Sequence, residues 1–342
     1  PPRFFSWRVR GNAYSWFMRN RAELEQDYDR IIVTSMVELS ALRGILPALA
    51  SIPTIVYFHE NQLAYPIQRP EQKREQMHFA ISSLYTAICG TTLLFNSEYN
   101  RSSFLSGIRA FLKKMPDFAP RSIVSELEQK SKVLPVPLEI ELFQNKKVPS
   151  PRTELFLVWN HRWEYDKGPQ VLFRGLELCK LNSIPFKLAL LGQQFSNMPD
   201  VFTMIESEFA EDLLQFGYLP SKEAYLSMVQ SCDYILSTAI HEFQGLAVLE
   251  AIALGLSPIA PNRLAYPEFI PAECLYPSVL DDEEEEAQGL FRHLAQIYQN
   301  NIVKKQIITN NSVDVSKVSW PALRGQYKEV IELTVLPPSA KE

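Results

Sequence analysis

The sequence predicts an α/β protein with parallel β-sheets arranged in two domains. Short apolar strands alternate with helical segments along the 342 residues, which is the pattern of parallel sheets covered by helices. With 46% hydrophobic residues and only 12 Gly, the chain can bury two ordinary cores. The charged, Pro-rich stretch NKKVPSPRT at residues 145–153 separates them as a linker. We therefore expect domains over residues 1–146 and 152–319, and a terminal helix over 320–334.

In the first half, apolar runs that end in polar turn residues predict strands at residues 31–35, 54–59, 91–97 and 132–137. Helices are expected after position 38, from the third strand to about position 114, and over 123–130. The chain opens in a charged aromatic tract rather than on a strand, so we expect a βα unit to precede residue 1.

In the second half, the expected strands cover residues 155–160, 186–192, 216–219 and 232–240. Helices are expected at 169–181, 201–210, 223–230 and 246–254, the first opening on Pro169 and the last ending before Gly255. The acidic run DDEEEE at 281–286 is interpreted as a solvated helix start.

Composition narrows the class of protein. Cys89, Cys179, Cys232 and Cys274 have no metal-binding spacing and sit mostly in apolar runs, so we expect neither disulfides nor structural zinc. No apolar run is long enough to span a bilayer, which predicts a cytoplasmic protein with no membrane partner. The net charge of −5 divides into about +5 for residues 1–149 and −10 for the remainder, which suggests an anionic partner for the first half.

The stretch from Cys232 to Pro261 carries the clearest chemistry. Glu242 follows a buried strand, Gly245 permits close backbone approach, and Glu250 lies within an apolar helix, where a carboxylate requires a polar partner. A helix start suits a phosphate, and Glu250 suits a vicinal diol. The structural alternative makes Glu242 a first-turn residue and Glu250 the partner of an arginine, and the residues alone leave both interpretations open.

Residues 1–22 combine arginines with aromatic side chains and hold no acidic residue. This composition suits phosphate contact and base stacking, although an ordinary exposed face over an aromatic core explains it as well. Asp27 and Asp29 form a D-x-D pair, which we reject as a metal site because it precedes its strand whereas ligands collect at the other end. His59 does lie at that end of its strand.

Two groups of motifs, one in each half of the chain, resemble known families. Glu242 and Glu250 stand as E-x7-E, which is similar to the donor-sugar motif of the retaining GT-B glycosyltransferases. The string FHENQLAYP at 58–66 resembles the tRNA-queuosine α-mannosyltransferase family, as do W-R-x-R at 7–10, TSMVELSALRGILP at 34–47 and FNSEYNRSSF at 95–104. The resemblance implies two facing Rossmann-like domains and a terminal helix that crosses back to the first. The sequence from Pro135 to Glu139, at the end of the strand expected at 132–137, departs from the turn sequence that related enzymes usually have there.

The resemblance also implies roles. The donor would be GDP-mannose, the acceptor queuosine in tRNA, and no cofactor or metal would be required. Catalytic roles fall to His59, Arg162, Lys167 and Glu242. Donor binding falls to Phe243, Gln244, Gly245, Leu246, Glu250, Tyr218 and Leu219, and tRNA docking to Arg3, Arg8, Arg10, Asn61 and Gln62. The alternatives are a mannosyl- or glucosyltransferase acting on a glycan or lipid, and a non-catalytic nucleotide- or RNA-binding module.

Overall fold

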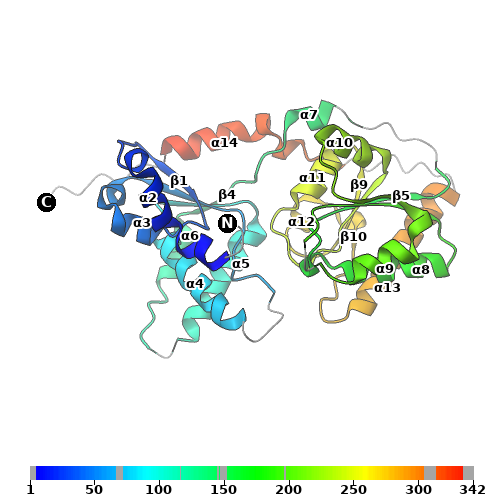
Figure 1. Cartoon of the computed structure of the whole chain (residues 1–342), viewed down its shortest axis with the longest axis horizontal. Helices are drawn as coiled ribbons and strands as arrows, with labels where there is room; N and C mark the ends of the chain where they lie inside the picture. The colour runs from blue at the N-terminus through cyan, green and yellow to red at the C-terminus, as the bar shows by residue number, and fades with distance from the viewer. Residues whose placement is uncertain are drawn as a thin grey trace. The chain divides into compact units, whose positions relative to one another are not determined.

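The computed structural model describes residues 5–66, 72–115, 117–144, 146, 152–195, 198–303 and 313–333 (Figure 1). The chain forms two compact units, one of Pro1–Pro135 with Leu323–Glu342 and the other of Val136–Ala322. Each unit contains a parallel sheet with helices packed around it, which confirms the predicted α/β class. Residues 136–144 belong to the second unit, ahead of the expected linker, most of which lies outside the described residues.

The sheet described in the first unit has the strand order β1-β2-β3-β4, with every neighbouring pair parallel. Its strands are Ile31–Thr34 (β1), Thr54–Phe58 (β2), Thr92–Phe95 (β3) and Ser131–Val133 (β4). β2 is buried at every position, which explains its uninterrupted β-branched and aromatic sequence TIVYF. The core packs Phe58 against Phe95 and Phe104 at ring distances of 4.7 Å.

The helices of the first unit include three that the sequence analysis did not predict, namely α1, α2 and α4. The helical segments are Phe5–Arg10 (α1), Asn12–Leu24 (α2), Leu39–Ile45 (α3), the 3-10 turn Pro47–Ser51, Gln72–Cys89 (α4), Glu98–Lys113 (α5), Ile123–Gln129 (α6) and Trp320–Leu333 (α14). Residues 323–333 of α14 belong to this unit, where the Tyr327 hydroxyl donates to the Pro135 carbonyl oxygen at 2.9 Å. The predicted terminal helix therefore returns to the first unit.

The sheet described in the second unit has the order β10-β9-β8-β5-β6-β7 and is entirely parallel. Its strands are Leu155–Asn160 (β5), Phe186–Leu191 (β6), Leu213–Gly217 (β7), Tyr234–Leu236 (β8), Ser257–Pro261 (β9) and Leu275–Tyr276 (β10). Two predicted strands differ: β7 begins three residues earlier than expected, and β8 occupies only three of nine expected residues. All positions of β7 but the last are half-buried, so its sequence shows no clear apolar pattern.

Helices cover both faces of this sheet. Figure 1 shows α8, α9 and α13 on one face and α10 and α11 on the other. The helices are Ile140–Gln144 (α7), Pro169–Leu181 (α8), Val201–Glu208 (α9), Lys222–Ser231 (α10), Leu246–Ala253 (α11), Tyr266–Phe269 (α12) and Glu283–Ile297 (α13). Single turns lie at Tyr165–Lys167, Ala210–Asp212, Ala272–Cys274, Tyr298–Val303 and Ser316–Val318. The Trp163 ring stacks on Phe202 at 4.5 Å within the core between β5 and its helices.

Candidate active site

The strand order of the second sheet locates its ligand-binding edge. The chain runs from β5 outward through β6 to β7, then returns to β8 on the other side of β5. The carboxyl ends of β5 and β8 therefore flank a point at which the strand order reverses, and open parallel sheets bind their ligands in the crevice there. His161 and Arg162 follow β5, and residues 237–242 follow β8.

A cavity of about 590 Å³ is lined by residues of these two loops, of the segments that end β6 and follow β7, and of helices α10 and α11. Its volume lies within the usual range for a small-molecule site. Five of the predicted site residues line it, namely Arg162, Lys167, Tyr218, Leu219 and Glu242. The other lining residues were not predicted as site residues: Asn160, His161, Leu191, Gly192, Gln193, Pro220, Lys222, Tyr225 and Ala247.

The backbone around Lys167 is fixed by the loop after β8. The Thr238 hydroxyl donates to the Lys167 carbonyl oxygen at 2.7 Å and accepts a hydrogen bond from the Trp159 indole at 3.0 Å. Gly168 has a left-handed φ of +63°, and a Cβ atom there would lie 2.1 Å from the Thr238 carbonyl oxygen. Only glycine fits this contact, so Gly168 allows the two loops to approach and positions Lys167.

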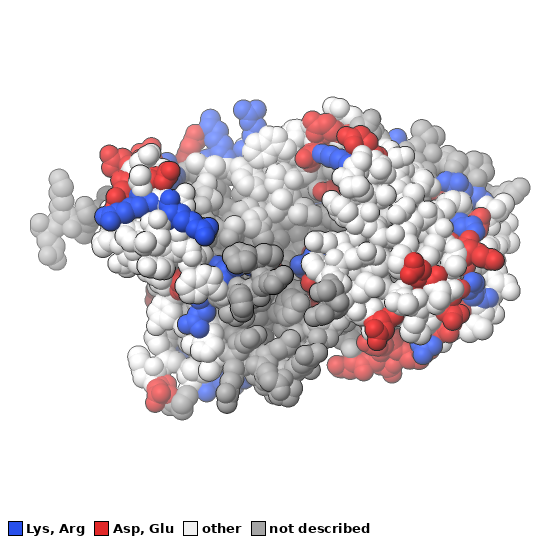
Figure 2. All heavy atoms as spheres, viewed as in Figure 1, with Lys and Arg blue, Asp and Glu red and all other residues white. Residues whose placement is uncertain are grey.

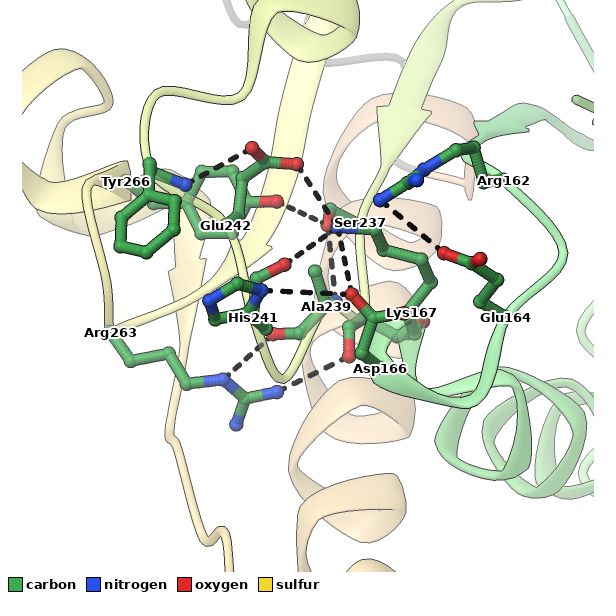
Figure 3. Close-up of polar contacts among 12 residues, drawn as sticks. Arg162, Glu164, Asp166, Lys167, Ser237, Ala239, His241, Glu242, Arg263 and Tyr266 are labelled. Atoms are coloured by element: carbon green, nitrogen blue, oxygen red, sulfur yellow. Dashed lines mark hydrogen bonds and ion pairs between the residues drawn. The ribbon is translucent and has the colours of Figure 1, made fainter. Parts of the chain in front are cut away.

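The Lys167 ammonium lies at the centre of a buried charge cluster (Figure 3). It donates to the His241 carbonyl oxygen at 2.6 Å and lies 3.3 Å from the Asp166 carboxylate and 3.5 Å from the Glu242 carboxylate. The side chain of Lys167 is 8% exposed and that of Asp166 is fully buried. A buried charge is tolerated when it is paired, so the two carboxylates explain how this lysine stays in the interior.

The same cluster keeps both carboxylates ionised. Burial acts to raise the pKa of Asp166, but His241 and Lys167 outweigh it and the pKa lies below its ordinary value. Burial likewise acts to raise the pKa of Glu242, and the charge of Lys167 with the backbone N–H groups of Phe243 and Gly245 brings it below the ordinary value. The Phe243 N–H donates to Glu242 Oε1 at 3.1 Å.

Two further features suit an anion. Arg162 is 55% exposed and lies 3.3 Å from Glu164, an ion pair of the kind that contributes little at a surface, so its guanidinium can exchange partners. Helix α11 starts at Gly245, which has a φ of +77° and provides no side-chain cap, and Ala247 of its first turn lines the cavity. The cavity thus combines Arg162 and Lys167 with a helix start.

Glu250 is half-buried on α11, and no hydrogen bond or ion pair to its side chain occurs within the described part of the chain. Its charged neighbours are Glu139 and Lys222, but these two pair with each other at 2.7 Å. Burial, followed by the negative charge of Glu139, raises the pKa of Glu250. The described residues include no arginine paired with Glu250, which is the partner that the structural alternative requires.

Two predicted donor residues turn away from the cavity. The Gln244 side chain is 2% exposed and pairs with the backbone of Val136, donating to its carbonyl oxygen and accepting from its N–H, both at 2.9 Å. Phe243 is buried edge-on against the His241 ring at 4.6 Å. Leu246 is exposed at the start of α11. The polar group of Gln244 is thus used to hold residue 136 rather than to face the cavity.

The acidic run is only partly the solvated helix start that we expected. Asp282 caps α13, with its carboxylate accepting from the N–H groups of Glu284 and Glu285. Glu286, however, is 2% exposed and lies 2.5 Å from the Arg263 guanidinium. Arg263 also donates to the carbonyl oxygens of residues 238 and 239, at 3.2 and 2.9 Å, so this buried pair supports the loop after β8.

In the first unit, the motifs FHEN and FNSEYN interlock through their amides. Asn96 donates to the His59 carbonyl oxygen at 2.9 Å, and Asn100 donates to the Phe58 carbonyl oxygen at 2.9 Å. Asn61 donates to Asn100 Oδ1 at 2.7 Å. Asn61 is 2% exposed, so its side chain shapes the loop instead of forming a docking surface, whereas the ring of His59 is exposed and packs on Tyr57 at 4.2 Å. Gln62 is half-buried beside Glu38.

The arginine-rich tract forms α1 and α2. Arg8 and Arg10 are exposed on α1, whereas Arg3 lies outside the described residues. Asn12 donates to the Val9 and Met36 carbonyl oxygens, both at 2.8 Å, and so ties α1 to the loop after β1. Figure 2 shows Lys and Arg side chains over the first helices, while Asp and Glu side chains gather along an edge of the second unit.

The described residues contain no group of three or more His, Cys, Asp and Glu side chains arranged to hold a metal ion. Within that same part of the chain, no helix is both long and apolar enough to cross a membrane. None of the four cysteines, all of which lie within the described residues, forms a disulfide bond.

Comparison with known proteins identifies both halves. Residues 1–138 match the family described as tRNA-queuosine alpha-mannosyltransferase N-terminal, and residues 141–312 match Glycosyl transferases group 1. The chain is 36% identical to the tRNA-queuosine alpha-mannosyltransferase of Drosophila melanogaster, across 81% of this chain and 74% of that protein. It is 23% identical to a GDP-mannose:cellobiosyl-diphosphopolyprenol alpha-mannosyltransferase of Xanthomonas oryzae, across 48% of this chain and 43% of that protein.

Solved structures agree on the fold. Anabaena HepE in complex with UDP superposes with a TM-score of 0.63 at 15% identity, covering 95% of this chain and 81% of that one. Sucrose-phosphate synthase from Thermosynechococcus elongatus superposes with a TM-score of 0.66 at 15% identity, covering 96% and 78%. These neighbours share the GT-B architecture. With both halves matched and a relative 36% identical over most of its length, the chain belongs to the tRNA-queuosine alpha-mannosyltransferase family of GT-B glycosyltransferases.

Proposed function

We propose that this protein transfers mannose from GDP-mannose to queuosine in tRNA, with retention of configuration and without a divalent metal. The observation that carries the proposal is the cavity at the strand-order reversal, where Arg162, Lys167 and Glu242 line one space. The names of two relatives support mannose as the sugar, and the Xanthomonas relative supports GDP-mannose as its donor. The cytoplasm is the compartment that a tRNA substrate favours.

The cavity suits the charge separation of glycosyl transfer. The diphosphate leaves as negative charge builds on it, while the sugar becomes oxocarbenium-like. Arg162, Lys167 and the start of α11 supply positive charge from preorganised groups, which is the most effective form of electrostatic catalysis. Glu242, ionised and anchored beside Lys167, would accept hydrogen bonds from hexose hydroxyls.

Glu250 is proposed to hold the ribose. A vicinal diol provides two O–H donors, and a carboxylate accepts both. Its half-buried side chain has no partner within the described residues, whereas the arginine-pair alternative requires one. Tyr218 and Leu219 line the cavity, whereas Glu250 is not among its lining residues, and these two are proposed to contact the base.

The first unit is proposed to bind the acceptor. Exposed Arg8 and Arg10 suit the tRNA backbone, because arginine contacts to phosphate position RNA without reading its sequence. His59, on the loop held by the Asn96 and Asn100 amides, is proposed to contact the reacting sugar or the queuosine hydroxyl.

Mass spectrometry of queuosine-containing tRNA tests this function. Incubation with GDP-mannose should increase the mass of the queuosine nucleoside by one hexose, and UDP-glucose should give no product. tRNA of the same sequence that lacks queuosine is the control. Transfer to a diphosphopolyprenol acceptor in place of tRNA would contradict the proposal, as would nucleotide binding without transfer.

A further inference from the structure

His161 is a buried side chain in the cavity wall, and one of its two ring nitrogens lacks a hydrogen-bond partner among the described residues. It follows β5 directly, is 7% exposed, and lines the cavity with Arg162 and Lys167. Its ring packs edge-on against Trp159, with centroids 4.9 Å apart. Its Nε2 atom is shielded from solvent and has no hydrogen-bond partner among the residues that the structure describes.

The electrostatic surroundings keep this imidazole neutral. Burial, and next the positive charge of Lys167, lower the pKa of His161 to about 4, against the smaller opposite effects of Glu242 and Asp166. At neutral pH the ring therefore offers one N–H donor and one lone pair. A neutral donor can lie beside the ammonium of Lys167 without adding to the buried positive charge.

An unpaired buried nitrogen is unfavourable in a folded protein. Leaving such an atom without a hydrogen bond forfeits its hydration, and native structures rarely do so without a functional reason. The charged neighbours of His161 do not satisfy it, because Lys167 already donates to His241 and lies beside both Asp166 and Glu242. Because His161 lines the cavity, a ligand bound there is the group that can supply the hydrogen bond that Nε2 lacks.

We propose that His161 is a specificity-determining residue whose Nε2 hydrogen-bonds an oxygen of the hexosyl diphosphate of the donor. This inference rests on the proposed function. It assigns His161 to the junction between the leaving phosphate and the sugar, because the cation that suits the phosphate, Lys167, and the carboxylate that suits the hexose, Glu242, line the same cavity as His161. Neither the base nor the ribose is involved.

Three substitutions separate this role from packing. His161→Gln keeps an amide near the position of Nε2, His161→Asn keeps one near Nδ1 instead, and His161→Phe keeps the ring on Trp159 but has no polar atom. Recognition through Nε2 predicts that Gln preserves donor affinity while Asn and Phe each lower it by about tenfold or more, the range for one hydrogen bond to a charged group. A structural role predicts the opposite order, with Phe tolerated and both amides destabilising.

The measurement is calorimetric titration of each variant with GDP-mannose, GDP and guanosine, alongside its melting temperature. An equal loss of affinity for GDP-mannose and GDP places the contact on the diphosphate. A loss of affinity for GDP-mannose alone places it on the sugar, and the affinity for guanosine should be unchanged. Unchanged affinity of a folded Phe variant would overturn the inference. If Phe does not fold, Asn and Gln binding equally would overturn it. A wild-type protein that binds neither GDP-mannose nor GDP would instead refute the proposed function, and the inference with it.

Discussion

Replacing Glu250 with Gln should separate binding from stability. Glu250 is half-buried on α11 without a partner in the described part of the chain, and burial and Glu139 raise its pKa. A carboxyl group with a raised pKa in the folded state makes its ionised form destabilising. This penalty is absent below the ordinary pKa of glutamate and grows as the pH rises through the folded-state value. The neutral amide removes it, so Glu250→Gln should melt no lower than wild type at pH 7.

Nucleotide binding should change in the opposite direction. Hydrogen bonds to charged groups contribute about 1.5–3 kcal/mol, and Gln retains a single acceptor oxygen. Loss of that amount corresponds to roughly 10- to 150-fold weaker binding. Because the ribose is common to both ligands, GDP and GDP-mannose should lose affinity equally in calorimetric titrations.

The matched control is Glu206→Gln. Glu206 is an exposed carboxylate on α9 and is not among the residues that line the cavity. This variant should leave nucleotide affinity unchanged and so exclude a general effect of net charge. Melting temperatures of wild type and Glu250→Gln, compared between pH 5 and pH 8, should diverge as the pH rises. If Glu250→Gln melts lower at every pH and the folded fraction binds GDP normally, Glu250 has a structural role and the ribose assignment fails.

Three further perturbations test other parts of the molecule. Lys167→Met should reduce turnover by about a hundredfold or more, the range for one preorganised charge-stabilising donor, while wild-type turnover should withstand excess EDTA; restoration by Mg²⁺ after such treatment would contradict metal independence. Replacing Arg8 and Arg10 with Ala should weaken tRNA binding and flatten its dependence on salt, and an equal loss of GDP-mannose affinity would refute a role confined to the acceptor. Gly168→Ala places a Cβ atom 2.1 Å from a backbone carbonyl oxygen and should lower the melting temperature by several degrees. By contrast, Gly44→Ala, with no atom within 4 Å, should stabilise its helix; equal melting temperatures for the two glycine variants would show that the contact at Gly168 relaxes.

Local sequence patterns determined most of the secondary structure. Helix α14 ends within one residue of the expected 320–334, and α11 was predicted to within one residue because strong helix formers lie between two glycines. Gly245 and Gly255 both adopt positive φ, of +77° and +100°. Such signals lie within a few residues of each other, so they can be interpreted without knowing the fold. The parallel sheets likewise followed from the alternation of strands and helices.

Strand limits at the site depended on the tertiary structure. The apolar run after Cys232 continues to Ile240, yet β8 ends at Leu236. Ser237 still donates to the Ile259 carbonyl oxygen of β9 at 2.8 Å, but the backbone then pairs with the loop after β5, where the Ile240 N–H donates to the Asp166 carbonyl oxygen at 2.8 Å. No feature of residues 237–240 themselves announces that partner.

The roles of polar side chains were the least predictable from sequence. Gln244 and Asn61 have the amide chemistry of ligand-binding residues, but both side chains hold backbone or side-chain groups of the protein. His161 carries no local signal beyond its place after a strand, whereas the structure buries it beside Lys167 in the cavity wall. A side chain's chemistry is set by its own atoms, but its partner is set by whichever distant segment the fold brings within about 3 Å. For that reason the sequence determined which residues were capable of binding, and only the tertiary structure decided which of them face the cavity.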